Sequence, residues 1–140
     1  EEAIKDGWFY SGDAGFFDNE GYLYIHDRVK DMIVSGGENI YPAEVENALM
    51  SHPEIADAAV IGVPDDKWGE SVKGFVVLQP DSSLDETEII SYTRSQIAGY
   101  KCPKTINFIE ALPRNPSGKI LRRELREPVW EGKDRMVSGN

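Results

Sequence analysis

The sequence has little of what a disulfide framework, a metal site or a membrane span requires. Its 140 residues include one cysteine, Cys102, and two histidines, His26 and His52. One thiol excludes an internal disulfide, and so few nitrogen and sulfur ligands, none in metal-ligand spacing, predict no metal site. No apolar run approaches the roughly 18 residues of a membrane span, and no signal peptide is visible. We therefore expect a reducing, cytoplasmic setting.

Basic residues are also scarce relative to acidic ones. Lys and Arg number 15 against 25 Asp and Glu, which gives a formal net charge of −10. A nucleic-acid-binding surface should be basic, as should a surface that adsorbs to anionic lipid. The acidic residues are dispersed along the chain, which favours a solvated surface. We expect neither nucleic acid nor a membrane among the partners.

What the sequence does contain begins with a hairpin pattern. Hydrophobic residues make up 40% of the chain, which is enough for a modest core. Residues 8–26 have two aromatic-rich runs around a turn in which Gly21 can adopt a left-handed conformation. The charged stretch 27–31 matches neither neighbour and indicates a linker, with a domain boundary near Lys30.

From residue 32 onward the apolar pattern predicts the order β-α-β-β-α-β-α. This is an α+β domain with a small, mostly antiparallel sheet flanked by helices. The first helix should begin at Pro42, with Glu44 and Glu46 suited to its positive N-terminal end. A capping box of Asp85 and Glu88 marks the start of the second. The expected strands lie early in 32–42 and at 55–63, 72–79 and 105–110, and a charged helix follows from about Ile120.

Two segments carry residues suited to ligand binding, although each also has a plain structural explanation. In YSGDAG, Asp13 lies between small residues, where its carboxylate could accept hydrogen bonds from the vicinal hydroxyls of a ribose; alternatively, it caps a turn. In SGGENIYP, the pair Gly36-Gly37 lets backbone approach another molecule closely, or it forms an ordinary turn. Arg28, just upstream, would then be a surface arginine.

The third segment, PRNPSGK, delivers Lys119 on a loop held by two prolines and a glycine. It is not a phosphate-binding Walker A loop, because Pro113 replaces the first glycine of that motif and Ile120 replaces its Ser or Thr. What remains is a cation on a flexible stem, suited to a phosphate or a developing oxyanion. A solvated surface lysine is the alternative.

In this order, the three segments resemble the last three signature motifs of the acyl-adenylate-forming superfamily, which groups acyl- and aryl-CoA synthetases, nonribosomal adenylation domains and luciferases. The resemblance covers residues 7–126. It implies a ligase that converts a carboxylic acid to acyl-AMP and then to a CoA thioester. ATP with Mg²⁺ and CoA would be substrates, with no permanently bound cofactor. GENIYPAEVE and the C-terminal WEGKDRMV are closer to fatty-acyl ligases; carrier-protein loading, or a non-catalytic interaction module, are the alternatives.

The resemblance also divides the chain. Residues 1–27 would be the terminal β-hairpin segment of an N-terminal adenylation domain, 28–31 the hinge, 32–126 the mobile C-terminal domain, and 127–140 a tail that could be disordered. The ATP phosphate loop, the Mg-binding glutamate motif and the acid pocket of the family would precede Glu1. The chain alone is therefore expected to be inactive, and the acid cannot be read from it.

For the adenylation step, the resemblance implies four roles. Asp13 would bind the ribose hydroxyls, Arg28 would contact the same nucleotide, and Lys30 would be the hinge residue. Lys119 would bridge the acid's carboxylate and the α-phosphate, offsetting the repulsion between two anions. Lys119 would then also be a target for a regulatory lysine acetyltransferase, because acetylation removes this charge.

For the CoA step, a second set of residues would act in another pose of the mobile domain. Cys102 stands where relatives can carry arginine, which departs from the pattern, and partial core packing is the alternative for Trp68 and Tyr100. The implied positions in the pantetheine tunnel and at the CoA nucleotide are Gly36, Gly37, Glu38, Trp68, Tyr100 and Lys104.

Overall fold

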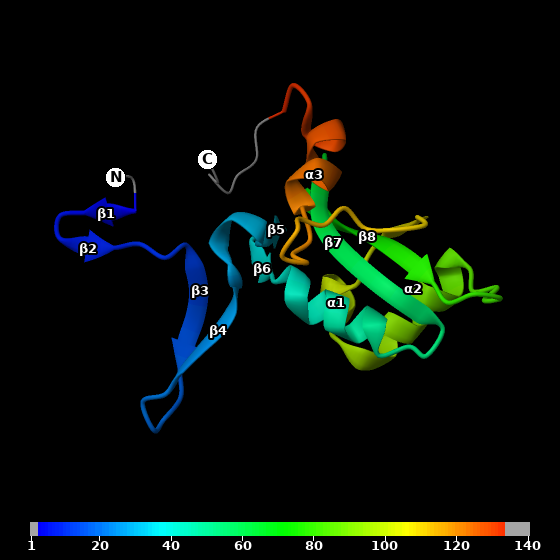
Figure 1. Ribbon diagram of the computed structural model, residues 1–140, viewed down its shortest axis with the longest axis horizontal. Helices are drawn as coiled ribbons and strands as arrows, with labels where there is room; N and C mark the ends of the chain where they lie inside the picture. Colours follow the sequence, from blue (N-terminus) through cyan, green and yellow to red (C-terminus); the bar gives the residue numbers. More distant parts are fainter. Residues whose placement is uncertain (1–2, 134–140) are drawn as a thin grey trace.

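The computed structural model describes residues 3–133 and shows two β-hairpins beside an α+β unit (Figure 1). The hairpin expected at 8–26 is present, with β3 (Asp13–Phe17) antiparallel to β4 (Leu23–Arg28). Its turn is held by the Asp18 carboxylate, which accepts hydrogen bonds from two backbone N–H groups, and by Gly21 at φ +88°. A second hairpin, β1 (Ile4–Lys5) with β2 (Trp8–Phe9), was not expected, because two-residue strands leave no alternating pattern.

The α+β unit follows from residue 29. Its sheet has the order β6-β5-β8-β7, and β9 pairs with β8. The β8–β9 pairing is parallel and the others are antiparallel, so the predicted α+β class with a mostly antiparallel sheet is confirmed. Its elements are a 3₁₀ turn (Val29–Asp31), β5 (Ile33–Ser35), β6 (Glu38–Ile40), α1 (Pro42–Met50), β7 (Ile55–Asp65), β8 (Gly69–Leu78), α2 (Glu86–Gln96), a 3₁₀ turn (Gly99–Lys101), β9 (Thr105–Phe108) and α3 (Arg122–Trp130).

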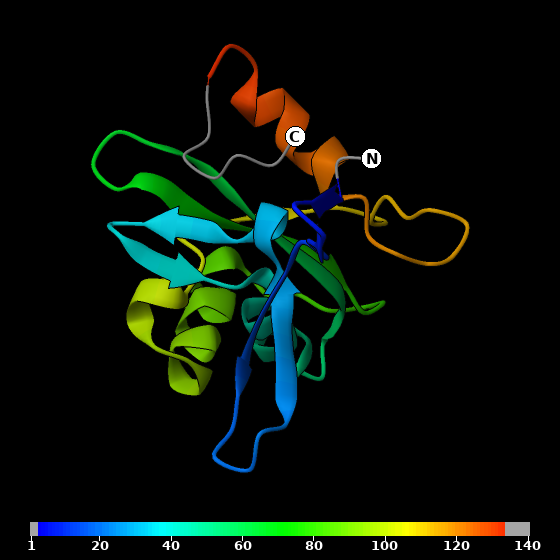
Figure 2. The same ribbon diagram turned by 90° about the vertical axis from the view of Figure 1, so that its left-hand side faces the viewer.

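Both faces of this sheet are covered. Helices α1 and α2 lie on one face and α3 on the other (Figures 1 and 2). Successive residues of β7 alternate between the two cores, which explains its nearly continuous apolar sequence. The first core includes Ile33, Ile40, Val45, Leu49, Val60, Val76, Ile89 and Ile106. The second contains Ala59, Ile61, Phe75 and Leu112, with Leu125 and Val129 of α3 packed against it.

Two expected boundaries differ from the structure. The segment 32–42 contains two strands, because Gly36 and Gly37 have φ of +58° and +85° and close a tight turn between β5 and β6. The capping box of α2 is confirmed. Helix α3 continues through Trp130, past residue 126 where the sequence suggested that the domain ends. The remainder of the suggested tail, 134–140, lies outside the described residues.

Candidate functional site

Asp13 and Arg28 face each other across the β3–β4 hairpin. They are directly paired in the strand register, and Arg28 Nε lies 3.5 Å from Asp13 Oδ1. Their side chains are 30% and 51% exposed, so the ion pair itself adds at most about 1 kcal/mol to stability. The pair instead presents a carboxylate and a guanidinium to solvent side by side. Such a surface can accept hydrogen bonds from a diol and donate them to an anion.

The proposed hinge residue, Lys30, lies in the 3₁₀ turn between β4 and β5. The next residue, Asp31, is buried. Its carboxylate lies 2.7 Å from Arg126 Nη1 and 3.8 Å from Arg122 Nη1. The chain is thus tied to α3 immediately after Lys30, which limits any pivoting to the residues before Asp31.

Two contacts join the β3–β4 hairpin to the start of α1. The N-cap residue Tyr41 has no side-chain capping bond. Instead, Asp27 of β4 accepts a hydrogen bond from the Ala43 N–H at 2.9 Å, which satisfies a donor that the helix leaves open. His26 stacks on Tyr41 with ring centroids 4.8 Å apart. This cap could not be predicted from the sequence, because capping motifs are local and Asp27 precedes the helix by fifteen residues.

Lys119 is exposed at the end of a compact turn. Asn115 closes the turn: its N–H donates to the Lys119 carbonyl and its Oδ1 accepts from the Lys119 N–H, both at 2.9 Å. Gly118 supplies the required positive φ of +86°. Arg114, which forms a β-bridge with Ile120, also contacts this turn through its side chain. Sequence reasoning chose Lys119 but missed Asn115 and Arg114.

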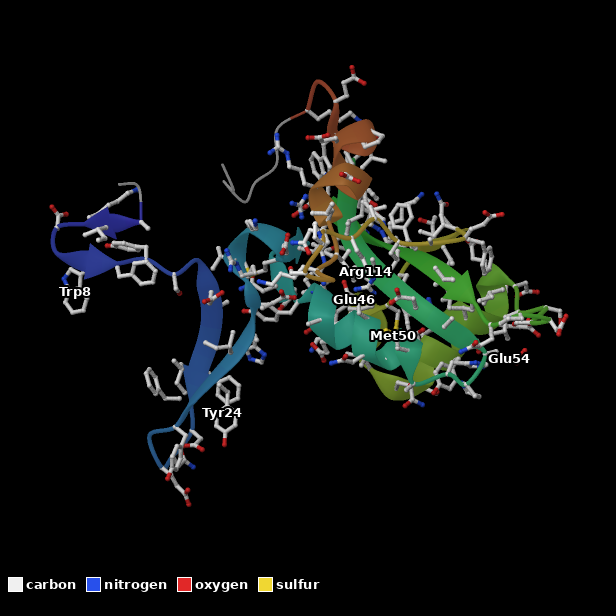
Figure 3. All side chains as sticks on the ribbon, viewed as in Figure 1. Trp8, Tyr24, Glu46, Met50, Glu54 and Arg114 are labelled. Carbon is white, nitrogen blue, oxygen red and sulfur yellow. The ribbon has the colours of Figure 1, made fainter. Side chains whose placement is uncertain are left out.

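Just beyond Lys119, a buried ion pair fixes the start of α3. Arg122 donates three hydrogen bonds to the Glu46 carboxylate at 2.6–3.0 Å, and the Val60 N–H donates a fourth at 3.1 Å. The Glu46 and Arg122 side chains are 7% and 17% exposed. Figure 3 shows Glu46 and Arg114 near the place where α1, β7 and the base of α3 meet. Glu46 therefore lies in the interior and does not serve as the helix-end charge that the sequence suggested.

The protein environment shifts the pKa values of both partners. Burial raises the pKa of Glu46, although the hydrogen bonds and charge of Arg122 oppose this shift. Burial, the largest single influence, would lower the pKa of Arg122, but its hydrogen bonds to Glu46 and the charges of the nearby carboxylates together raise it. The partners are 76 residues apart in sequence, so no local pattern could have revealed them.

A second surface joins Gly36, Trp68 and Lys104. The Gly36 N–H donates to the Trp68 carbonyl at 2.9 Å, and Lys104 Nζ lies 5.7 Å from the Trp68 ring centroid. Trp68 and Tyr100 are 42% and 53% exposed, so neither belongs to the core. Glu38 and Gly37 are exposed beside this surface. An exposed aromatic face with a neighbouring ammonium suits an aromatic, anionic ligand.

The contact between Gly36 and Trp68 leads to a stability prediction. A Cβ on Gly36 would lie 2.8 Å from the indole, whereas one on Gly37 would meet nothing within 4 Å. Both residues have positive φ, so Gly37→Ala should cost about 1–2 kcal/mol of unfolding free energy through backbone strain alone. Gly36→Ala should cost more, because the Trp68 ring must also move. Urea unfolding of both variants tests this, and equal losses would contradict the close contact.

Asp65 provides a pH-dependence prediction. Its pKa is lowered, first by a hydrogen bond from the Trp68 N–H and then by Lys104. A carboxyl group whose pKa is lower in the folded state stabilises the fold above its unfolded pKa, and this contribution is lost as pH falls through the folded pKa. The loss of unfolding free energy in Asp65→Asn should thus be largest near neutral pH and should become smaller below about pH 4. Urea unfolding near neutral pH and below about pH 4 measures this loss, with Asp66→Asn as the control for removal of a charge. A loss that is the same at both pH values would contradict the prediction.

The structure thus forms two separate groups from the predicted residues, Asp13 with Arg28 and Gly36 with Trp68 and Lys104. Tyr100 lies instead beside Lys101. Within residues 3–133, no set of His, Cys, Asp and Glu side chains could hold a metal ion. No helix in this part of the chain is long and apolar enough to cross a membrane.

Comparison with known proteins identifies the family. A family model described as the AMP-binding enzyme C-terminal domain matches residues 44–119. The fatty acid–[acyl-carrier-protein] ligase ScoC of Streptomyces coeruleorubidus is 48% identical over 137 residues, 98% of this chain and 26% of that protein. The long-chain-fatty-acid–CoA ligase FadD13 of Mycobacterium tuberculosis is 51% identical over 126 residues, 90% of this chain and 25% of that protein.

A solved structure agrees with these sequence matches. The o-succinylbenzoate CoA synthetase MenE from Bacillus subtilis, in complex with the acyl-adenylate intermediate OSB-AMP, has a TM-score of 0.82 and 42% identity. The match covers 99% of this chain and 27% of that one, so the chain spans about a quarter of the length of these relatives. The resemblance seen in the three motifs is confirmed: the chain belongs to the family of AMP-binding enzyme C-terminal domains.

Proposed function

We propose that the chain is the C-terminal part of an ATP-dependent acid–CoA ligase acting on a fatty or related acid. The observation that carries the proposal is the braced turn of residues 114–120, which holds Lys119 in solvent at the end of the family match. An exposed lysine held this way, whose ammonium makes no hydrogen bond or ion pair within residues 3–133, is available to anions that another part of the protein would bind.

In the first step, an oxygen of the acid's carboxylate attacks the α-phosphorus of ATP, and pyrophosphate leaves. Asp13 would accept hydrogen bonds from the ribose hydroxyls, and Arg28 would contact the same nucleotide. Lys119 would lie between the carboxylate and the α-phosphate, where its charge lowers the cost of bringing two anions together. The Mg²⁺ of the nucleotide would arrive with ATP.

In the second step, the CoA sulfur attacks the acyl carbonyl carbon, and AMP leaves. The thin pantetheine chain would pass Gly36, Gly37 and Glu38, while Trp68 and Lys104 would contact the CoA nucleotide, with Tyr100 nearby. Lys30 would be the pivot about which the mobile domain turns. In the second pose this surface would take the place of Lys119 at the active site. The tie between Asp31 and α3 supports that placement, because it anchors the residue after Lys30 to the α+β unit; a turn about Lys30 would break the Asp27–Ala43 and His26–Tyr41 contacts.

The partner of this chain would be the N-terminal adenylation domain of the same protein. The two hairpins expose many large apolar side chains, and such a surface marks an interaction site. Residues 1–27 would then belong to that domain, 28–31 to the hinge, and residues from 32 through at least the end of α3 at Trp130 to the mobile domain. The apolar side chains concerned include Ile4, Trp8, Phe9, Tyr10, Phe16, Phe17, Tyr22, Leu23, Tyr24 and Ile25.

Loading of a carrier protein is the second candidate, favoured by the similarity to ScoC. Mass spectrometry of the thioester formed by the full-length protein, offered free CoA and an acyl carrier protein in turn, separates the two. A non-catalytic interaction module is disfavoured by the presence of Asp13, Arg28 and Lys119 together. We also propose that acetylation of Lys119 by a lysine acetyltransferase would block the first step alone, since it removes the cation.

ATP–pyrophosphate exchange tests the main proposal. The full-length protein should catalyse exchange with at least one member of a panel of fatty and aryl acids, and residues 1–140 alone should catalyse none. Exchange by the isolated chain would contradict the proposal, and so would a full-length protein that binds ATP yet forms neither acyl-AMP nor thioester with any acid.

A further inference from the structure

The Lys119 turn raises a problem of orientation. Its backbone bonds, from the Asn115 N–H to the Lys119 carbonyl and from the Gly118 N–H to the Asn115 carbonyl, lie within the turn. They fix its shape but do not fix its direction relative to the sheet. A lysine that must reach two anions held elsewhere needs both, because a misplacement of about 1 Å can cost about 10²-fold in rate.

Arg114 supplies a direct side-chain connection between the turn and the sheet. Its Nη1 donates to the Gly118 carbonyl at 2.6 Å, and its Nη2 donates to Asp57 Oδ2 at 2.5 Å. Asp57 belongs to β7. This strand is paired with β8 along nearly its whole length and is packed between α1 on one face and α3 on the other. One guanidinium therefore ties the turn to β7, an edge strand of the sheet that is held by β8 and by the helices on both faces.

The Arg114 contact also falls on the peptide group that joins Gly118 to Lys119. The Gly118 carbonyl and the Lys119 N–H belong to the same peptide unit. Arg114 binds its oxygen, and Asn115 Oδ1 accepts from its N–H at 2.9 Å. With both sides of this planar unit held, and with the Lys119 carbonyl bonded to the Asn115 N–H, the backbone of Lys119 is fixed on both sides of its Cα.

Stability alone does not account for this arrangement. The Arg114 and Asp57 side chains are 40% and 25% exposed, and an ion pair this open is worth at most about 1 kcal/mol. The geometry of the ion pair is more specific than its small contribution to stability would require. A guanidinium presents several donors in a fixed fork, whereas a lysine ammonium is a point charge and cannot reproduce that fork.

We propose that Arg114 is a positioning residue that orients Lys119 for acyl-AMP formation, anchored by Asp57. This inference rests on the proposed function. Arg114 acts through Lys119 and does not touch the substrate. It should matter for the adenylation step and be dispensable for the thioester step.

The test uses single-turnover acyl-AMP formation and, separately, thioester formation from supplied acyl-AMP, both with the full-length protein. Arg114→Ala should lower the first rate about 10- to 10²-fold and leave the second within about twofold of the unmodified protein. Arg114→Lys should retain most of the defect. Arg123→Ala, which removes an exposed arginine at the second position of α3, is the matched control and should change neither rate.

The double variant Arg114→Ala with Lys119→Ala distinguishes positioning from a general structural role. If Arg114 acts through Lys119, the double variant should be no slower in adenylation than Lys119→Ala alone. A further loss in the double variant, equal losses in both steps, or full adenylation by Arg114→Ala would each overturn the inference. Failure of Lys119→Ala itself to impair adenylation would instead overturn the proposed function, so the two failures are distinguishable.

Discussion

Replacing Lys119 by alanine in the full-length protein should slow acyl-AMP formation about 10²- to 10³-fold, the usual loss when one oxyanion-stabilising contact is removed. The reason is electrostatic, because the carboxylate and the α-phosphate would then meet without a cation between them. Thioester formation from supplied acyl-AMP should survive largely intact, since the Gly36–Trp68–Lys104 surface is separate from the turn. Single-turnover assays of each step measure the two effects independently.

Lys133→Ala is a suitable control for this variant. It removes the same charge from another exposed lysine, in the turn after α3, to which no role is assigned. Both of its rates should match those of the unmodified protein. An equal loss of both steps in Lys119→Ala would contradict the assignment of one surface to each step. Normal adenylation would remove Lys119 from the site altogether.

Replacing Glu46 by alanine should lower the free energy of unfolding by about 3–5 kcal/mol, which is typical when one member of a buried ion pair is removed. The change leaves the Arg122 guanidinium buried, with the Asp31 carboxylate 3.8 Å away as its remaining ion-pair partner. It also removes the acceptor of the Val60 N–H. Urea unfolding of residues 1–140, followed by far-UV circular dichroism, measures the loss.

Two comparisons identify the cause of this loss. Arg123→Ala breaks an exposed pair with Glu127, whose side chains are 84% and 62% exposed, and should cost no more than about 0.5 kcal/mol. Glu46→Met combined with Arg122→Met should recover much of the stability lost in Glu46→Ala, since it removes the unpaired Arg122 charge and leaves Asp31 paired with Arg126. If Glu46→Ala cost as little as Arg123→Ala, the pair would not be buried in solution.

Much of the secondary structure and the main candidate residues could be predicted from the sequence. The capping box of Asp85 and Glu88, the Gly21 turn and the start of α1 at Pro42 depend on neighbours a few residues apart. The motifs that contain Asp13 and Lys119 can also be recognised from residues that are close together in the sequence. The prediction failed between β5 and β6, where two short strands give too few residues for an alternating pattern, and at Glu46, whose local context favoured a helix-end charge.

What the sequence by itself determined, then, was local: turns, caps, apolar alternation and the family motifs. The tertiary structure decided which charges pair with one another near the Lys119 turn. Glu46 pairs with Arg122 across 76 residues, and Arg114 reaches Asp57 across 57. In the sequence, each of these side chains resembles an ordinary solvated charge. Only folding brings the partners within hydrogen-bonding distance, and in the Glu46–Arg122 pair burial then makes the loss of one partner costly.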